Sequence, residues 1–189
     1  MTVSLVPKSA ANLLKELKRD GHKLEAPIDI EAIVNNLGMK IKLDPSLTKE
    51  GIVSKIDFCP PKGNGALITI SSEANRFDLK RRLVLAHEIG HWYLHKDGPY
   101  CAFVDTPDSM DIKESYWDHL EFEANRFAHQ LLIPKRLILK EGKALIEDFH
   151  SQNGPDHKID EEDFVRSMSR IFEVSGATMR HRLENIGIL

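Results

Sequence analysis

The chain has 189 residues, which at about 150 residues per domain corresponds to one domain or to one domain with a small appendage. Hydrophobic residues make up 41% of the chain and charged residues 29%, a composition that excludes a disordered protein, a collagen and a coiled coil. The net charge of −3 lacks the basic excess of a strong nucleic-acid binder, so the composition favours a globular domain with another kind of partner.

The N-terminal third of the chain predicts two helices followed by short strands. Apolar residues recur at helical spacing in Ser9–Arg19, and a second helix is expected to begin near Pro27 and Asp29 and to end at Gly38. Three strand-like runs follow: Met39–Leu43, Gly51–Phe58 and Ala66–Ile70. Because the separator Pro60–Gly65 is typical of a hairpin loop, we expect a small antiparallel sheet that precedes the next helix.

Helices predominate in the rest of the predicted structure. The pattern predicts a helix at Asp78–His95 and a turn-rich loop from Lys96 to about Ser115. Further helices are expected at Tyr116–Leu132, Lys135–Phe149, Glu161–Phe172 and Ala177–Asn185. The segment Ser151–Asp156 predicts a linker. We therefore expect an α+β protein with a mainly helical core domain at residues 1–150 and a C-terminal helix pair, arranged like a helix-turn-helix, at residues 151–189.

The predicted helix Asp78–His95 carries an HExxH motif, His87-Glu88-Ile89-Gly90-His91. Residues four apart lie on one face of a helix, so both imidazoles can reach the same metal ion. Neutral imidazole suits Zn²⁺, and catalytic zinc sites use three protein ligands and leave a fourth position for water. Glu88 lies one step around the helix and can accept a proton from that water. The motif predicts a metal-dependent hydrolase with His87 and His91 as metal ligands and Glu88 as catalytic base.

The third metal ligand is expected on the next helix, where two glutamates compete for the role. Glu121 precedes Asn125 by four residues, a spacing at which the amide can support a metal-binding histidine through a hydrogen bond. At about 100° per residue, Glu121 also lies somewhat nearer the predicted buried face than Glu123 does. We therefore prefer Glu121, keep Glu123 as the alternative ligand, and otherwise interpret Glu123 as a surface charge.

Other polar side chains near the motif have weaker assignments. His95 follows His91 by four residues, but the eight residues from His87 to His95 rise about 12 Å, too far for one ion to bind both. We interpret His95 as a helix-end residue that meets the helix dipole. Tyr93 and His119 are candidates for stabilising an oxyanion, although no spacing selects them.

Two stretches of the chain together resemble the ImmA/IrrE family of metallo-endopeptidases. They are Arg82–His91, running on to Leu94 and His95, and Glu121–Pro134. The likeness covers roughly residues 26 to 134 and, loosely, 174 to 183. By motif position, the resemblance implies a zincin-like metallopeptidase domain in which His87, His91 and Glu121 bind the metal and Glu88 is the base. The family's usual Arg-Phe-Thr appears here as Arg82-Leu83-Val84, which bears on packing rather than on chemistry.

The resemblance also implies a partner and a biological role. It implies a small cytoplasmic zinc endopeptidase that makes limited cuts in a helix-turn-helix repressor encoded nearby and so relieves transcriptional repression. Zn²⁺ is the expected cofactor, with Mn²⁺ as the alternative. A competing hypothesis is a non-catalytic metal-binding partner or antitoxin-type regulator that acts by binding protein or DNA. Ser151–Leu189 holds five basic and seven acidic side chains, which disfavours direct nucleic-acid binding by the helix pair.

The sequence predicts a cytoplasmic protein without a membrane partner. Met1–Ala10 contains no apolar run of signal-peptide length, and no stretch approaches the roughly 18 apolar residues of a spanning helix. The two cysteines, Cys59 and Cys101, lack the Cys-x-x-Cys spacing of a thiolate zinc site and are too few for a disulfide framework. Two lone thiols fit a reducing compartment.

Overall fold

The computed structural model describes residues 8–59, 65–110 and 118–189, and these form an α+β fold with nine helices and four strands. The helices are α1 (Ala10–Arg19), α2 (Ile30–Asn36), α3 (Ser46–Lys49), α4 (Ser72–Arg76), α5 (Asp78–His95), α6 (His119–Leu132), α7 (Lys135–Asn153), α8 (Glu161–Phe172) and α9 (Gly176–Asn185). The strands are β1 (Lys40–Leu43), β2 (Ser54–Asp57), β3 (Leu67–Ile70) and β4 (Ala102–Asp105). The α+β class is therefore confirmed.

The four strands form one mixed sheet in the order β1-β3-β2-β4. β2 runs antiparallel to β3, as the predicted hairpin requires, and its loop at residues 60–64 lies outside the described residues. The prediction of an antiparallel sheet that precedes the motif helix is wrong in two respects. β1 pairs parallel with β3, and β4 follows α5 in the chain and pairs antiparallel with β2. β4 lies inside the segment predicted as a loop, because its four residues acquire strand structure only through long-range pairing.

Side-chain caps begin most of the predicted helices. Ser9 accepts a hydrogen bond from the backbone of α1, Asp29 from α2, and Asp118 from the first turn of α6. The predicted bounds of α5 and α8 match the structure. α7 instead continues past Phe149 through half of the predicted linker and ends at Gly154, whose φ of 93° closes the helix. The short helices α3 and α4 were not predicted.

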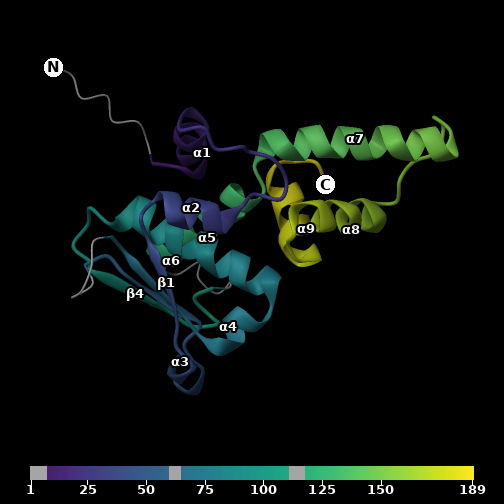
Figure 1. Ribbon diagram of the computed structural model, residues 1–189. Helices are drawn as coiled ribbons and strands as arrows, with labels where there is room; N and C mark the ends of the chain where they lie inside the picture. Colours follow the sequence, from purple (N-terminus) through teal and green to yellow (C-terminus); the bar gives the residue numbers. More distant parts are fainter. Residues whose placement is uncertain (1–7, 60–64, 111–117) are drawn as a thin grey trace.

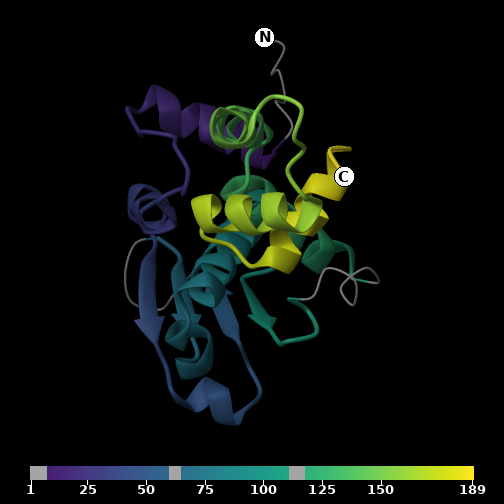
Figure 2. The same ribbon diagram turned by 90° about the vertical axis from the view of Figure 1, so that its right-hand side faces the viewer.

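Helix α5 lies at the centre of the fold. It contacts β2 and β3 of the sheet as well as α2, α4 and α6, while α6 contacts α1 and α9. Figures 1 and 2 show the sheet in the lower half of the molecule and α7, α8 and α9 in the upper half. A single cluster of buried apolar side chains extends from Ala10 in α1 to Leu183 in α9. The division of the chain at residue 150 stays a prediction.

None of the helices in the described ranges is long and apolar enough to cross a membrane.

Candidate metal centre

A close approach of α5 and α6 brings the two predicted metal-binding motifs together. Every residue from Val84 to His91 is buried, because this part of α5 lies between the sheet and α6. At Gly90 the two backbones meet: a Cβ atom added there would lie 3.1 Å from the carbonyl oxygen of Ala124. The absence of a side chain at Gly90 therefore lets α6 approach the helix turn that carries His87 and His91.

Three of the expected site residues lie together at this crossing. The Nε2 atoms of His87 and His91 are 2.9 Å apart, and Oε2 of Glu121 lies 3.3 Å from each of them. Glu88, the expected base, follows His87 on α5 and is fully buried. The structure thus brings His87, His91 and Glu121 into one cluster and places Glu88 beside it.

Asp105, at the end of β4, is a fourth member of the cluster that the sequence reasoning missed. Its Oδ1 lies 3.3 Å from Nε2 of His87 and 3.8 Å from Nε2 of His91. One donor atom from each of His87, His91, Asp105 and Glu121 lies within 4.8 Å of all the others, and all four residues are buried. In the sequence, Asp105 is marked only as an acidic residue at the end of a short apolar run, Ala-Phe-Val-Asp. Because such runs are common in loops, this pattern did not single out Asp105.

Hydrogen bonds outside the cluster orient both imidazoles. Nδ1 of His87 lies 2.8 Å from Oδ1 of Asn125, and the Asn125 amide nitrogen donates to the carbonyl of Ser109 at 2.7 Å. Because the amide nitrogen is used by Ser109, its oxygen accepts from His87, which places the imidazole proton on Nδ1 and leaves Nε2 as a donor for a metal ion. The spacing of Glu121 and Asn125 predicted this support.

A second chain of hydrogen bonds supports His91. Nδ1 of His91 lies 3.2 Å from Nδ1 of His95, and Nε2 of His95 lies 3.2 Å from a carboxylate oxygen of Glu123. With the proton of His95 directed at Glu123, His95 accepts from His91, so the Nε2 atom of His91 also remains available to a metal ion. His95 ends α5, as predicted. Glu123 is not the isolated surface charge expected of it, since it orients His91 through His95.

The directions of the pKa shifts indicate that the carboxylates of the cluster favour a positive charge between them. Burial lowers the pKa of His87, but the carboxylates of Asp105 and Glu121 outweigh burial and raise it to about 10. The same contacts, working against burial, hold the pKa of Asp105 well below its usual range and lower that of Glu121. Burial and the neighbouring Asp105 carboxylate raise the pKa of Glu88 well above its ordinary value.

The donor set fits a divalent metal ion. Within the described residues, both carboxylate oxygens of Glu88 and Oε2 of Glu121 are buried without a hydrogen-bond partner. Such groups are costly unless a cation compensates them. Two imidazole nitrogens and two carboxylate oxygens are donors that Zn²⁺ accepts. His87, His91, Asp105 and Glu121 could therefore hold a metal ion.

Two residues considered as oxyanion stabilisers lie away from the cluster. The hydroxyl of Tyr93 donates to Glu16 of α1 at 3.2 Å, and burial together with Glu16 raises its pKa to about 12. The His119 side chain is exposed and contacts Glu123. The structure therefore directs neither side chain at the donor atoms.

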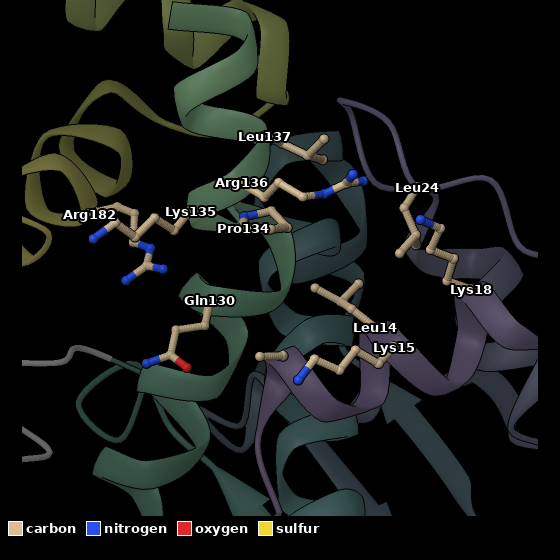
Figure 3. Close-up of a pocket in the computed structure, with 11 residues that line it drawn as sticks. Leu14, Lys15, Lys18, Leu24, Gln130, Pro134, Lys135, Arg136, Leu137 and Arg182 are labelled. Carbon is tan, nitrogen blue, oxygen red and sulfur yellow. The ribbon is translucent and has the colours of Figure 1, made fainter.

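The cavity drawn in Figure 3 is separate from the donor cluster. It has a volume of about 390 Å³ and lies between α1 and the turn from α6 into α7. Five of its lining residues are basic: Lys15, Lys18, Lys135, Arg136 and Arg182. Since no donor residue is among the described residues that line it, the candidate chemistry belongs to the crossing of α5 and α6 and not to this cavity.

The fold and the cluster define an α+β protein with a buried candidate metal centre. The family model for Peptidase_M78, described as the IrrE N-terminal-like domain, matches residues 62–184, which is well over half of the chain. The chain belongs to this metallopeptidase family, and the resemblance predicted from its motifs is confirmed. A comparison with curated proteins found no match.

Proposed function

We propose that the protein is a zinc-dependent endopeptidase of the HExxH type with a zincin-like core, in which His87, His91 and Glu121 bind the metal and Glu88 is the catalytic base. Mn²⁺ is the alternative metal. The observation that carries this proposal is the convergence of the three donor atoms at mutual distances of 2.9 to 3.3 Å, next to a buried glutamate. Donors bound at about 2.0–2.2 Å around a tetrahedral ion lie about 3.3–3.6 Å apart. Both distances to Glu121 agree with this range, and the two imidazole nitrogens, at 2.9 Å, would move slightly apart around an ion.

The side chains divide the work of peptide hydrolysis between them. A bound Zn²⁺ would supply Lewis acidity that activates water and polarises the scissile carbonyl. Asn125 and His95 keep the imidazole protons on Nδ1, so both Nε2 atoms would be available to bind the metal ion. Glu88 takes a proton from the attacking water onto its carboxylate and returns it to the leaving nitrogen. Glu88 suits this role because it is fully buried beside the donor atoms, where no bulk water competes for its carboxylate.

The substrate we propose is a helix-turn-helix repressor encoded near the gene, cut at a limited number of sites in the cytoplasm so that transcriptional repression is relieved. Family membership supports a protein substrate. The resemblance of Arg82–His91 and Glu121–Pro134 to the ImmA/IrrE family supports the class of that substrate. Repression would end when the repressor loses the connection between its DNA-binding part and the rest of its chain.

The test is cleavage of that repressor by the full-length protein loaded with zinc, with fragments identified by mass spectrometry. Glu88→Gln should retain the metal and cut about 10²- to 10⁴-fold more slowly, the usual contribution of a general base. Glu147→Gln, an exposed change of the same kind on α7, should cut at the wild-type rate. Cleavage that survives Glu88→Gln unchanged would exclude this mechanism.

One observation favours the competing function, a metal-binding regulator without catalysis. Zinc sites with four protein ligands are typically structural, whereas catalytic sites keep one position for water. Asp105 adds a second carboxylate, and so a fourth donor residue, to the cluster and is fully buried. A protein that binds zinc stoichiometrically and cleaves neither the repressor nor any other protein would favour this alternative.

A further inference from the structure

Asp105 lies where a fourth metal ligand would lie. Its Oδ1 is 3.3 Å from Nε2 of His87 and 3.8 Å from Nε2 of His91, close to the spacing of about 3.3–3.6 Å between donors of a tetrahedral zinc site. Among the other three donors, Glu121 lies 3.3 Å from each imidazole nitrogen, and the two nitrogens are closer to each other, at 2.9 Å. Four donor atoms from α5, α6 and β4 thus approximate the four corners of one coordination shell.

We propose that Asp105 is a fourth protein ligand that closes the metal site, so that the folded protein is latent until this carboxylate leaves. Ligation by Asp105 would occupy the position that a hydrolytic water needs. Latency rests on the proposed peptidase function, whereas ligation by Asp105 can be tested without any turnover.

The contacts of Asp105 separate a fixed backbone from an exchangeable side chain. Its carbonyl accepts a hydrogen bond from the backbone of Val53 at 2.8 Å, and its register with Ser54 holds the end of β4 on the sheet. Apart from the two imidazoles, the carboxylate contacts the hydroxyls of Ser54 at 3.5 Å and Ser109 at 3.4 Å. Both hydroxyl contacts are longer than the backbone hydrogen bond, so the strand end is held more firmly than the carboxylate would be once the imidazoles bind a metal ion.

The other three donors are less able to leave. His87 is oriented by Asn125 at 2.8 Å and His91 by His95 at 3.2 Å, and both imidazoles lie on the buried part of α5. Glu121 lies 3.3 Å from both imidazoles, whereas Asp105 is 0.5 Å farther from one than from the other. Asp105 also neighbours Glu88, whose pKa it raises, so it stands next to the proposed base. Among the four donors, Asp105 is the one whose departure would expose the ion to water beside that base.

The experiment measures access to the metal in the cobalt-substituted, full-length protein. Acetohydroxamate is titrated into wild type, Asp105→Ala and Asp105→Asn, and binding is followed by the visible absorption of Co²⁺. Zinc affinity is measured in parallel by competition with a chelator. Asp108→Asn is the matched control, because Asp108 is exposed and lies in the turn that follows β4, three residues after Asp105.

Acetohydroxamate should bind Asp105→Ala at least ten-fold more tightly than it binds wild type, and zinc affinity should fall at least ten-fold. Asp108→Asn should match wild type in both measurements. Asp105→Asn keeps the size of the side chain and serves if Asp105→Ala fails to fold. Hydroxamate binding to wild type as tight as to both Asp105 variants, or unchanged zinc affinity in them, would overturn the assignment.

The same proteins separate this inference from the proposed function. If Asp105→Ala binds acetohydroxamate but neither it nor wild type cuts the repressor, Asp105 is a ligand and the peptidase proposal fails. If Asp105→Ala cuts faster than wild type at saturating zinc, both hold. Cleavage by wild type that Asp105→Ala abolishes, with zinc still bound, would contradict latency and assign Asp105 to catalysis.

Discussion

Substituting Gly90 by alanine probes the contact between α5 and α6 that assembles the candidate metal centre. The added Cβ atom would lie 3.1 Å from the carbonyl oxygen of Ala124, 3.2 Å from its Cα atom and 3.3 Å from the Phe127 ring. The two nearest atoms belong to the backbone of α6, which cannot rotate out of the way as a side chain can. The helices must therefore separate by a few tenths of an ångström, and Glu121 must move away from the histidine pair on α5.

The net cost is the difference between two opposing effects. Overpacking of a well-packed core typically costs about 1–3 kcal/mol. Alanine is better than glycine inside a helix by about 1 kcal/mol, which offsets part of this loss. We expect Gly90→Ala to lower the free energy of unfolding by about 1 kcal/mol. For a protein of this size, that corresponds to a fall in Tm of about 2–4 °C.

Gly142→Ala is the matched control on α7. Its Cβ atom would meet the tip of the Phe164 ring at 3.3 Å and the end of the Met168 side chain at 3.7 Å, both of which can adjust. The helix propensity of alanine should then dominate and raise Tm slightly. Thermal unfolding of the metal-free proteins and chelator competition for zinc measure both variants. If Gly90→Ala is as stable as Gly142→Ala and binds zinc as wild type does, the reasoning about the backbone contact is refuted.

Two further predictions concern the ligands and the pH dependence. Glu121→Ala should lower zinc affinity by more than about 100-fold in a chelator competition. Asn125→Ala and Glu123→Ala should lower it by only the roughly 10- to 100-fold that is typical of groups that orient ligands. A larger loss of zinc affinity for Glu123→Ala than for Glu121→Ala would reverse the assignment of the third ligand. Burial, and next the neighbouring His181, lowers the pKa of His129 to about 4, below its value of 6.5 in the unfolded chain. Between these two pH values the folded state binds fewer protons than the unfolded state. The protein therefore loses stability as the pH falls from 6.5 to 4, by roughly 3 kcal/mol at most. In urea unfolding at pH 7 and pH 4.5, His129→Gln should lose less stability than wild type on acidification, and an equal loss in both would contradict this origin.

The local part of the metal centre could be predicted from the sequence. Helical spacing puts His87 and His91 on one face, and the spacing of Glu121 and Asn125 anticipates both the third donor and the hydrogen bond to His87. The structure brings these side chains together because a helix converts sequence spacing into position almost without reference to the rest of the fold, while their roles as ligands stay predictions. The bounds of α5 follow for the same reason.

The parts that could not be predicted depend on contacts between distant segments. Asp105 reaches the cluster because β4 pairs with β2, about 50 residues earlier in the chain. A strand of four residues is too short for its hydrophobic pattern to predict such a pairing. The link between His95 and Glu123 depends on how α5 and α6 cross. The parallel pairing of β1 with β3 places β2 outside the pair although it lies between them in sequence.

Under the proposed ligation, Asp105 would change how the other three donors act. A zinc ion held by three protein ligands keeps a fourth position for water, as catalytic sites do. A zinc ion that also bound Asp105 would have four protein ligands, as structural sites do. A fourth donor that carries a negative charge would strengthen the hold on a divalent cation and would at the same time take the place of water. Affinity and turnover therefore oppose each other at Asp105. Under the proposed function, this opposition would let the peptidase stay loaded with metal and inactive until the carboxylate is displaced, and so spare proteins other than its substrate.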